Sequence, residues 1–416
     1  MDFDVIVVGG GPAGSFTAKH IAAQGFKVLI LEEHDLVGEP VNCAGLLSRR
    51  AIELSGVSAR IIINKLTGAR VYSPLGACLE LAGNHTWAAV VERSMFDQEL
   101  AEQAQTDGAF LFTGARVKGL EPAPGGYLVS CSCRNGKDIS FSTSLVIGAD
   151  GAKSRVARCL NLKPGPYKAS ICAAETELSR TSADLADIFL GSELSPGWFG
   201  WIIPLDHKRC RIGAGHAFVK EAYSPRYYLE QLINRFPDHF RGIKIVRYTS
   251  GVVPMGLMPK IYAQHAMLVG DAACQTKPIS GGGIYPGLRG AQICAAVAVQ
   301  ALQEDDFSQE KLALYQELWD KEFGSEIYSG ISHRINYLDL NDHDIDTILR
   351  FLNKPFWQKT ILEQGDIDFP SCLSSCLSTA RPWKMKILKG MLGALNWGSD
   401  LKNSLKLHSA DLKEEV

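Results

Sequence analysis

Two glycine-rich loops have the residue types and spacing to hold a phosphate or another anionic group. The first, Gly9–Gly14, carries the pattern GxGxxG, with glycines at positions 9, 11 and 14. The second combines Gly270 and Asp271 with the run Pro278–Gly283, which ends in three glycines. Glycine lets a backbone approach a ligand closely, and a helix N-terminus presents free N–H groups to anionic oxygens. Because the loops lie far apart in the sequence, we expect one large cofactor to be held at both of its ends.

The first loop lies between elements that form a recognisable nucleotide-binding unit. The continuous apolar run Val5–Val8 predicts a buried parallel strand, an alanine-rich helix extends to about Gln24, and a second strand covers Lys27–Leu31. Glu32 ends that strand, 18 residues after Gly14. This arrangement matches the βαβ dinucleotide fingerprint, in which the acid binds a ribose with a free 2′-hydroxyl. The sequence predicts FAD or NAD here rather than NADP; the alternative is a strand–turn–helix without a ligand.

Two further strands end at residues that can face the same ligand. A buried strand from Leu145 leads to Asp150 and Gly151, and a strand from His265 leads to Asp271. The helix expected from Gly287 to about Gln303 is rich in small residues, which indicates close packing on a sheet.

An aromatic motif lies in the middle of the chain. Residues from about Pro164 to Val253 alternate in the manner of an antiparallel sheet, which one helix at Tyr227–Phe236 interrupts. Within this region the segment Pro196–Pro204 holds three aromatic residues. Aromatic residues at this density usually belong to a core. Alternate residues of a strand share one face, so these can instead line an apolar substrate tunnel.

Two single residues have both a structural and a functional interpretation. Cys43 lies in the loop between Gly38 and Ser48, where a buried inert thiol is the usual outcome and a position beside the cofactor is the alternative. Arg93 begins a helix expected to reach about Thr106, either as a solvated charge or as a partner of the cofactor.

Composition limits the class of protein. The chain has 416 residues, 46% of them hydrophobic, and a net charge of −2. This length exceeds one ordinary core, so two domains or one discontinuous domain are expected. No long basic block is present, which argues against nucleic-acid binding. The 11 cysteines show no zinc-ligand spacing, and no metal site is expected.

The absence of a secretory signal and of a long apolar run predicts a location in the cytoplasm. The N-terminus has no secretory signal, and no run of 18 or more apolar residues exists, so we expect free thiols and no membrane span. Residues 381–397 carry four basic residues, no acidic residue and large apolar residues at helical spacing. They predict either a helix on the inner face of an anionic membrane or a helix docked on the protein.

With these motifs in place, residues 1–330 resemble the geranylgeranyl reductase family, which is related to the FAD enzymes of the aromatic-hydroxylase type. Gly9–Gly14 with Glu32 is similar to its FAD motif, and Pro40–Cys43 to its Pro-Val-x-Cys segment, whose cysteine lies beside the flavin. Pro278–Gly283 resembles the loop over the isoalloxazine. Pro196–Pro204 resembles the Pro-x-x-aromatic-x-Trp-x-x-Pro motif that lines the prenyl site.

The resemblance implies an α/β fold, with a Rossmann-like FAD-binding domain, an antiparallel substrate sheet and a helical C-terminal region. The proposed domains are residues 1–65, 90–160 and 254–330 for FAD, 66–89 and 161–253 for substrate, and 331–416 for the helical region.

The expected site residues follow from the same comparison, with Asp271 reaching the ribityl chain of FAD. The expected FAD contacts are Gly9, Gly11, Pro12, Ala13, Gly14, Glu32, Glu33, Cys43, Ala44, Gly45, Arg93, Val117, Asp150, Gly151, Gly270, Asp271, Pro278, Gly281, Gly282, Gly283 and Ile284. The expected substrate contacts are Pro196, Trp198, Phe199, Trp201 and Pro204. The candidate catalytic residues are Cys43, Phe199 and Trp201.

The implied reaction is saturation of isolated C=C bonds in a prenyl chain, by hydride from N5 of reduced flavin and a proton. Phe199 and Trp201 would stabilise positive charge on the substrate through their rings, and Cys43 would position groups or relay a proton. NADPH or ferredoxin would supply electrons. Archaeal lipid reductases of the family usually read Arg-Cys-x-Glu-Gly where this chain has Asn42–Leu46, so a prenyl diphosphate, a glycerolipid and a prenylated quinone all stay open as substrates.

Two other functions remain as alternatives. One is a flavin monooxygenase or halogenase of the same fold, because Phe199–Pro204 differs by one aromatic residue from the halogenase pattern Trp-x-Trp-x-Ile-Pro. The other is an electron-transfer flavoprotein subunit without a small substrate of its own.

Overall fold

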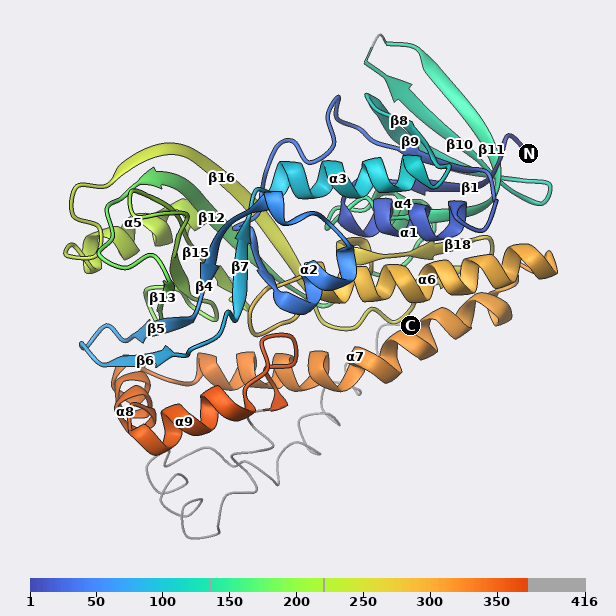
Figure 1. Ribbon diagram of the computed structural model, residues 1–416. Coiled ribbons are helices and arrows are strands. Elements are labelled where there is room, and N and C mark those ends of the chain that lie inside the picture. Colours follow the sequence, from blue (N-terminus) through green and yellow to red (C-terminus); the bar gives the residue numbers. More distant parts are fainter. Residues whose placement is uncertain (135, 220, 373–416) are drawn as a thin grey trace. The chain divides into compact units, whose positions relative to one another are not determined.

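The first glycine loop leaves the centre of an eight-stranded sheet. The computed structural model describes residues 1–134, 136–219 and 221–372 (Figure 1). In this sheet β1 (Phe3–Val8) lies between β2 (Val28–Leu31) and β11 (Asp138–Gly148), parallel to both. Val5–Val8 are buried, which explains their unbroken apolar character. The other strands are β8 (Phe110–Phe112), β9 (Ala115–Ala123), β10 (Gly126–Cys133), β17 (Tyr262–Ala263) and β18 (Ala266–Leu268).

Three helices pack around the first loop of this sheet. The helix α1 (Pro12–Ala22) follows the loop directly and packs between α3 (Arg93–Thr106) and α6 (Ile284–Glu304), as Figure 1 shows. The small residues of α6 allow this approach, since Ala291, Ala295 and Ala298 are all buried in the core. A short helix, α4 (Arg155–Cys159), follows β11.

A seven-stranded sheet corresponds to the antiparallel sheet that the sequence predicted. Its strand order is β16-β12-β15-β14-β13-β5-β6, and only the β13–β5 pair is parallel. The helix α5 (Pro225–Arg235) packs on β12 and β15. The strands are β5 (Gly68–Tyr72), β6 (Cys78–Ala82), β12 (Tyr167–Glu177), β13 (Leu185–Phe189), β14 (Gly200–Pro204), β15 (Arg209–Ala217) and β16 (Lys244–Met255).

A small sheet and a long helix connect the two large sheets. The small sheet has the order β3-β7-β4, with β3 (Leu46–Ser48), β7 (Ala88–Val91) and β4 (Ile62–Leu66), and α2 (Arg49–Ser55) and the 3₁₀ turn η1 (Ala59–Ile61) flank it. The helix α7 (Gln309–Leu338) packs on α6 and continues to the second sheet (Figure 1). The helices α8 (Asp342–Leu352) and α9 (Pro355–Gln364) pack on β6.

These elements confirm the predicted α/β class with a Rossmann-like sheet, an antiparallel sheet and further helices near the C-terminus. Residues 1–371 form one compact unit. The division into three domains stays a proposal, and its boundary between residues 330 and 331 would cut the continuous helix α7.

The structure bears on the prediction that no helix spans a membrane. Within residues 1–372, no helix has the length and apolar character needed to cross a bilayer. The basic segment 381–397 lies outside the described residues.

Candidate cofactor and substrate site

The Gly9–Gly14 loop has room for a ligand at one glycine only. A Cβ on Gly9 would lie 2.4 Å from the carbonyl oxygen of Ala149, and one on Gly14 would lie 2.0 Å from the carbonyl oxygen of Gly9. These two glycines let β1, β11 and α1 meet. A Cβ on Gly11 would meet no protein atom within 4 Å. Gly11 caps α1 without a side-chain hydrogen bond, so no side chain occupies the N-terminus of the helix where a pyrophosphate would bind.

Glu32 lies directly beside this loop. Its Oε2 accepts a hydrogen bond from the Gly10 N–H at 2.7 Å, and its Oε1 accepts one from the His34 N–H at 2.9 Å. Glu33 is exposed and forms an ion pair with Arg116 at 3.3 Å. Val117 is buried on the neighbouring strand β9. The acid at the end of β2 therefore has the position relative to the loop that the fingerprint requires.

The two glycine loops meet. Gly270 begins the 3₁₀ turn η2 (Gly270–Ala273) with φ of +66°, and a Cβ on it would lie 2.8 Å from the Cβ of Ala13. A Cβ on Gly283, the residue before α6, would lie 3.1 Å from Oδ1 of Asp271. Asp271 thus lies between the pyrophosphate loop and the triple glycine, as expected for a contact to the middle of a long cofactor.

Burial perturbs the carboxylate of Asp271. The residue keeps part of its surface accessible, yet burial raises the pKa of its carboxyl to about 6 while the charge of Arg93 acts to lower it. An acid so desolvated gains from hydroxyl donors, which a ribityl chain provides. The observed residues therefore fit FAD.

Arg93 is not a solvated charge. It is buried, and it forms an ion pair with Asp97 at 2.8 Å. Burial opposes its charge, but Asp97 and the neighbouring thiol of Cys43 outweigh that cost and raise the pKa of Arg93. The structure therefore places Arg93 close to both Cys43 and Asp271, and the solvated interpretation was wrong.

The side chain of Asp150 forms its hydrogen bonds within the protein. Its carboxylate accepts hydrogen bonds from the Ser154 hydroxyl at 2.6 Å and from the Val156 N–H at 3.0 Å, at the start of α4. Its backbone N lies near the position of a Cβ on Gly9, and Gly151 follows with φ of +74°. Any contact of Asp150 with the cofactor would therefore come from the backbone.

The aromatic motif packs against the triple glycine. Trp198 is 1% exposed and Trp201 is 7% exposed. The ring of Phe199 stacks on Trp198 at 5.0 Å and meets the edge of Trp201 at 5.8 Å. A Cβ on Gly281 would lie 2.9 Å from the indole of Trp198. The strand β14 begins at Gly200, so Phe199 precedes it.

Two pockets open beside the Cys43 loop. One, of about 480 Å³, is lined by Pro40–Asn42, Cys172, Ser224–Arg226 and residues 247–250. The other, of about 770 Å³, extends from Glu33 and Arg134 to Glu92 and Arg247. Cys43 itself is exposed. Neither pocket includes the aromatic motif, so a prenyl tunnel lined by Phe199 and Trp201 stays a proposal.

Sequence reasoning missed two buried arginines that hold the site together. Arg211 of β15 donates to the carbonyl oxygens of Ala44 at 3.2 Å and Val91 at 2.9 Å, so the second sheet holds the Cys43 loop. Arg334 of α7 donates to the carbonyl oxygens of Pro278, Ile279 and Gly197. Nothing in the local sequence distinguishes either arginine from a surface charge.

Arg334 joins the triple-glycine loop to the aromatic motif. Its guanidinium lies 4.5 Å from the ring centre of Trp198 and 5.2 Å from that of Phe199. Burial lowers its pKa to about 10, which leaves the group charged at neutral pH. Gly330, one turn earlier, permits this approach, since a Cβ there would lie 3.1 Å from the ring of Pro278. The helix α7 therefore fixes both loops at once.

We expect Arg334→Met to destabilise the protein by about 3 kcal/mol, because buried carbonyl oxygens lose a charged donor. The matched control is Arg289→Met, which removes a half-buried ion pair between α6 and α7 with Glu322 at 2.7 Å. The control should cost only about 1 kcal/mol. Urea unfolding of both variants measures the difference, and equal losses would contradict the role given to Arg334.

Comparisons with known proteins agree with this geometry. Residues 4–356 match the family model described as lycopene cyclase protein. The digeranylgeranylglycerophospholipid reductase of Methanosarcina acetivorans is 32% identical over 363 residues, which are 83% of this chain and 87% of the relative.

Solved structures with the same fold include a reductase-like protein and a monooxygenase. A geranylgeranyl bacteriochlorophyll reductase-like protein from Thermoplasma acidophilum superposes with a TM-score of 0.82 at 25% identity, over 94% of this chain and 99% of that one. The p-nitrophenol 4-monooxygenase of Pseudomonas putida superposes with a TM-score of 0.70 at 18% identity, over 89% and 98%, and shows the fold alone. The chain therefore belongs to the family of FAD-dependent geranylgeranyl reductases, within the group that the lycopene cyclase model describes.

Proposed function

We propose that this protein is an FAD-dependent reductase that saturates isolated C=C bonds of a prenyl chain in an isoprenoid lipid. The observation that carries the proposal is the contact between Gly281 and the indole of Trp198. It brings the aromatic motif directly against the loop expected over the flavin ring. The kinship with digeranylgeranylglycerophospholipid reductases supports the choice of substrate class.

Different residues of the chain would bind the cofactor and stabilise the reacting substrate. The Gly9–Gly14 loop and the N-terminus of α1 would bind the pyrophosphate, and Asp271 would bind the ribityl hydroxyls. Reduced FAD supplies a hydride when bound. Protonation of an unactivated alkene develops positive charge, so the ring faces of Phe199 and Trp201 would lower the barrier and their bulk would exclude water.

Cys43 is the candidate for moving or positioning the proton. It is exposed at the loop that Arg211 holds, and it lies against the buried Arg93. In this proposal the thiol donates its proton to one carbon of the alkene, and the adjacent Arg93 stabilises the negative charge left on sulfur.

We further propose NADPH or ferredoxin as the electron donor and a peripheral contact with the membrane that holds the substrate. Reducing the bound flavin chemically makes the first experiment independent of the physiological electron donor. Enzyme reduced by dithionite under strict anaerobiosis, given a geranylgeranyl lipid, should yield a product with two more hydrogens per saturated bond by mass spectrometry. Product that forms only with oxygen would favour a monooxygenase or halogenase, and no product with any lipid would favour an electron-transfer subunit.

In this assay we expect Cys43→Ser to lower kcat about 100-fold with little change in KM, because a serine hydroxyl is a much weaker acid than a thiol. The matched control is Cys78→Ser on the distant strand β6, which should keep the wild-type rate. Unchanged activity of Cys43→Ser would remove Cys43 from proton transfer.

A further inference from the structure

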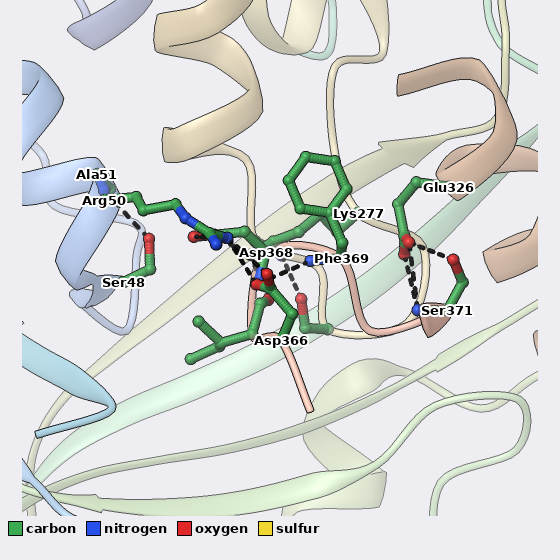
Figure 2. Close-up of polar contacts among 12 residues, drawn as sticks. Ser48, Arg50, Ala51, Lys277, Glu326, Asp366, Asp368, Phe369 and Ser371 are labelled. Carbon is green, nitrogen blue, oxygen red and sulfur yellow. Dashed lines mark hydrogen bonds and ion pairs between the residues drawn. The ribbon is translucent and has the colours of Figure 1, made fainter. Parts of the chain in front are cut away.

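The segment Asp366–Ser371, called the strap below, returns from the end of α9 to the base of the triple-glycine loop (Figure 2). Its residues Asp366, Asp368, Phe369 and Ser371 contact α2, Lys277, α6 and α7. None of them was predicted to belong to the site. The contact of Asp368 is the most buried of these.

Asp368 forms a buried ion pair with Lys277, the residue before Pro278. The ammonium of Lys277 donates to Oδ1 of Asp368 at 2.9 Å and to the carbonyl oxygen of Ile367 at 2.8 Å. The side chain of Lys277 is 7% exposed and that of Asp368 is 1% exposed. The second carboxylate oxygen, Oδ2, is buried without a hydrogen-bond partner among the described residues, and the guanidinium of Arg50 lies 3.8 Å from it.

Lys277 also closes the glycine loop on itself. Its N–H donates to the carbonyl oxygen of Gly282 at 3.1 Å, and its own carbonyl oxygen accepts from the Gly281 N–H at 2.8 Å. A Cβ on Gly282 would lie 2.9 Å from Cε of Lys277, so the lysine side chain extends directly beneath this glycine. The position of Lys277 therefore determines the shape of the loop.

Other strap residues hold Asp368 in place from both sides. Asp366 accepts two hydrogen bonds from Arg50 of α2, at 2.7 and 2.8 Å (Figure 2). Phe369 stacks on Phe323 of α7 at 5.2 Å and meets the edge of Tyr285, in the first turn of α6, at 6.3 Å. The strap thus contacts the residue before the loop and the first turn of the helix after it.

We propose that Asp368 is a positioning residue for the cofactor: through its ion pair with Lys277 it holds the loop Lys277–Gly283 in the shape that covers the flavin. Asp368 touches neither the cofactor nor the substrate in this role. The inference rests on the FAD-dependent function proposed above, and it extends that function to a segment beyond α9.

The neutral isostere Asp368→Asn tests the proposal in the holoenzyme. We expect the amides of Gly281–Gly283 to exchange with solvent at least tenfold faster, and the Kd for FAD to rise at least tenfold, because Lys277 loses its anchor. The double variant Lys277→Met/Asp368→Leu avoids an unpaired buried charge and so should stay folded. It should show the same faster exchange and weaker FAD binding.

The matched control is Lys311→Met, which breaks a lysine–carboxylate pair with Glu304 at 2.6 Å at the far end of α6. It should leave both readouts at wild-type values. Wild-type loop exchange and FAD affinity in the folded double variant would overturn the proposal. If instead the wild-type enzyme fails to reduce any prenyl chain while Asp368→Asn still accelerates loop exchange, the proposed substrate is wrong and the positioning role stands.

Discussion

Gly11→Ala should lower the affinity for FAD about 100-fold and leave the cofactor-free protein close to its wild-type stability. A Cβ on Gly11 would meet no protein atom within 4 Å, so the fold has room for it. The same open space is where the pyrophosphate must approach the backbone and the N-terminus of α1. An alanine in place of glycine at an N-cap costs no more than about 1 kcal/mol of stability. Fluorescence titration with FAD and thermal melting of the cofactor-free protein measure the two effects separately.

Gly14→Ala is the matched comparison, because it adds the same methyl group one helical turn later. There the Cβ would lie 2.0 Å from the carbonyl oxygen of Gly9 and 3.0 Å from the Cβ of Ala149. Both neighbours directly follow strands of the eight-stranded sheet, Gly9 after β1 and Ala149 after β11, so α1 would have to move. We expect a loss of several kcal/mol in stability for the protein without FAD. Wild-type FAD affinity in Gly11→Ala would show that the pyrophosphate binds elsewhere.

Local patterns in the sequence were enough to predict the fold around the cofactor. The run Val5–Val8 is buried on both faces and therefore has no polar interruption, while Gly14 is required by its contact with Gly9, and Gly9 by its contact with Ala149 after β11. The constrained residues themselves stand close together in the chain, so their periodicity and spacing are visible in one sequence even where, as for Gly9, the neighbour is distant. The same holds for Glu32, which directly follows the next strand, β2.

Contacts between distant segments could not be predicted in this way. Arg334 binds the carbonyl of Pro278, and Asp368 pairs with Lys277, across sequence separations that leave no local pattern. An arginine in an amphipathic helix or an aspartate in a loop is usually solvated, so its type carries no signal of burial. Burial can be missed even for a local pair. Arg93 forms its ion pair with Asp97, only four residues away, but nothing in the types of these two residues indicates that they are buried.

Asp271→Asn should have opposite effects on the protein with and without FAD. Burial raises the pKa of Asp271 from 3.8 to about 6, so the folded protein binds more protons than the unfolded chain between these values. Stability of the wild-type protein without FAD therefore falls as pH rises through this window. Asparagine carries no charge and avoids that loss, so the variant should be more stable than wild type at pH 8, by at most about 3 kcal/mol, and equal to it below about pH 4.

Binding of FAD should change in the other direction. A carboxylate accepts stronger hydrogen bonds from ribityl hydroxyls than an amide does, so the Kd of Asp271→Asn should rise at least about tenfold. Asp320→Asn on α7 is the matched control, because burial also raises the pKa of that carboxyl but its hydrogen-bond partner is Gln316. The control should gain stability at high pH without losing FAD affinity. A variant of Asp271 that binds FAD like wild type, or unfolds with the wild-type pH profile, would show that this carboxylate does not face the cofactor from a desolvated position.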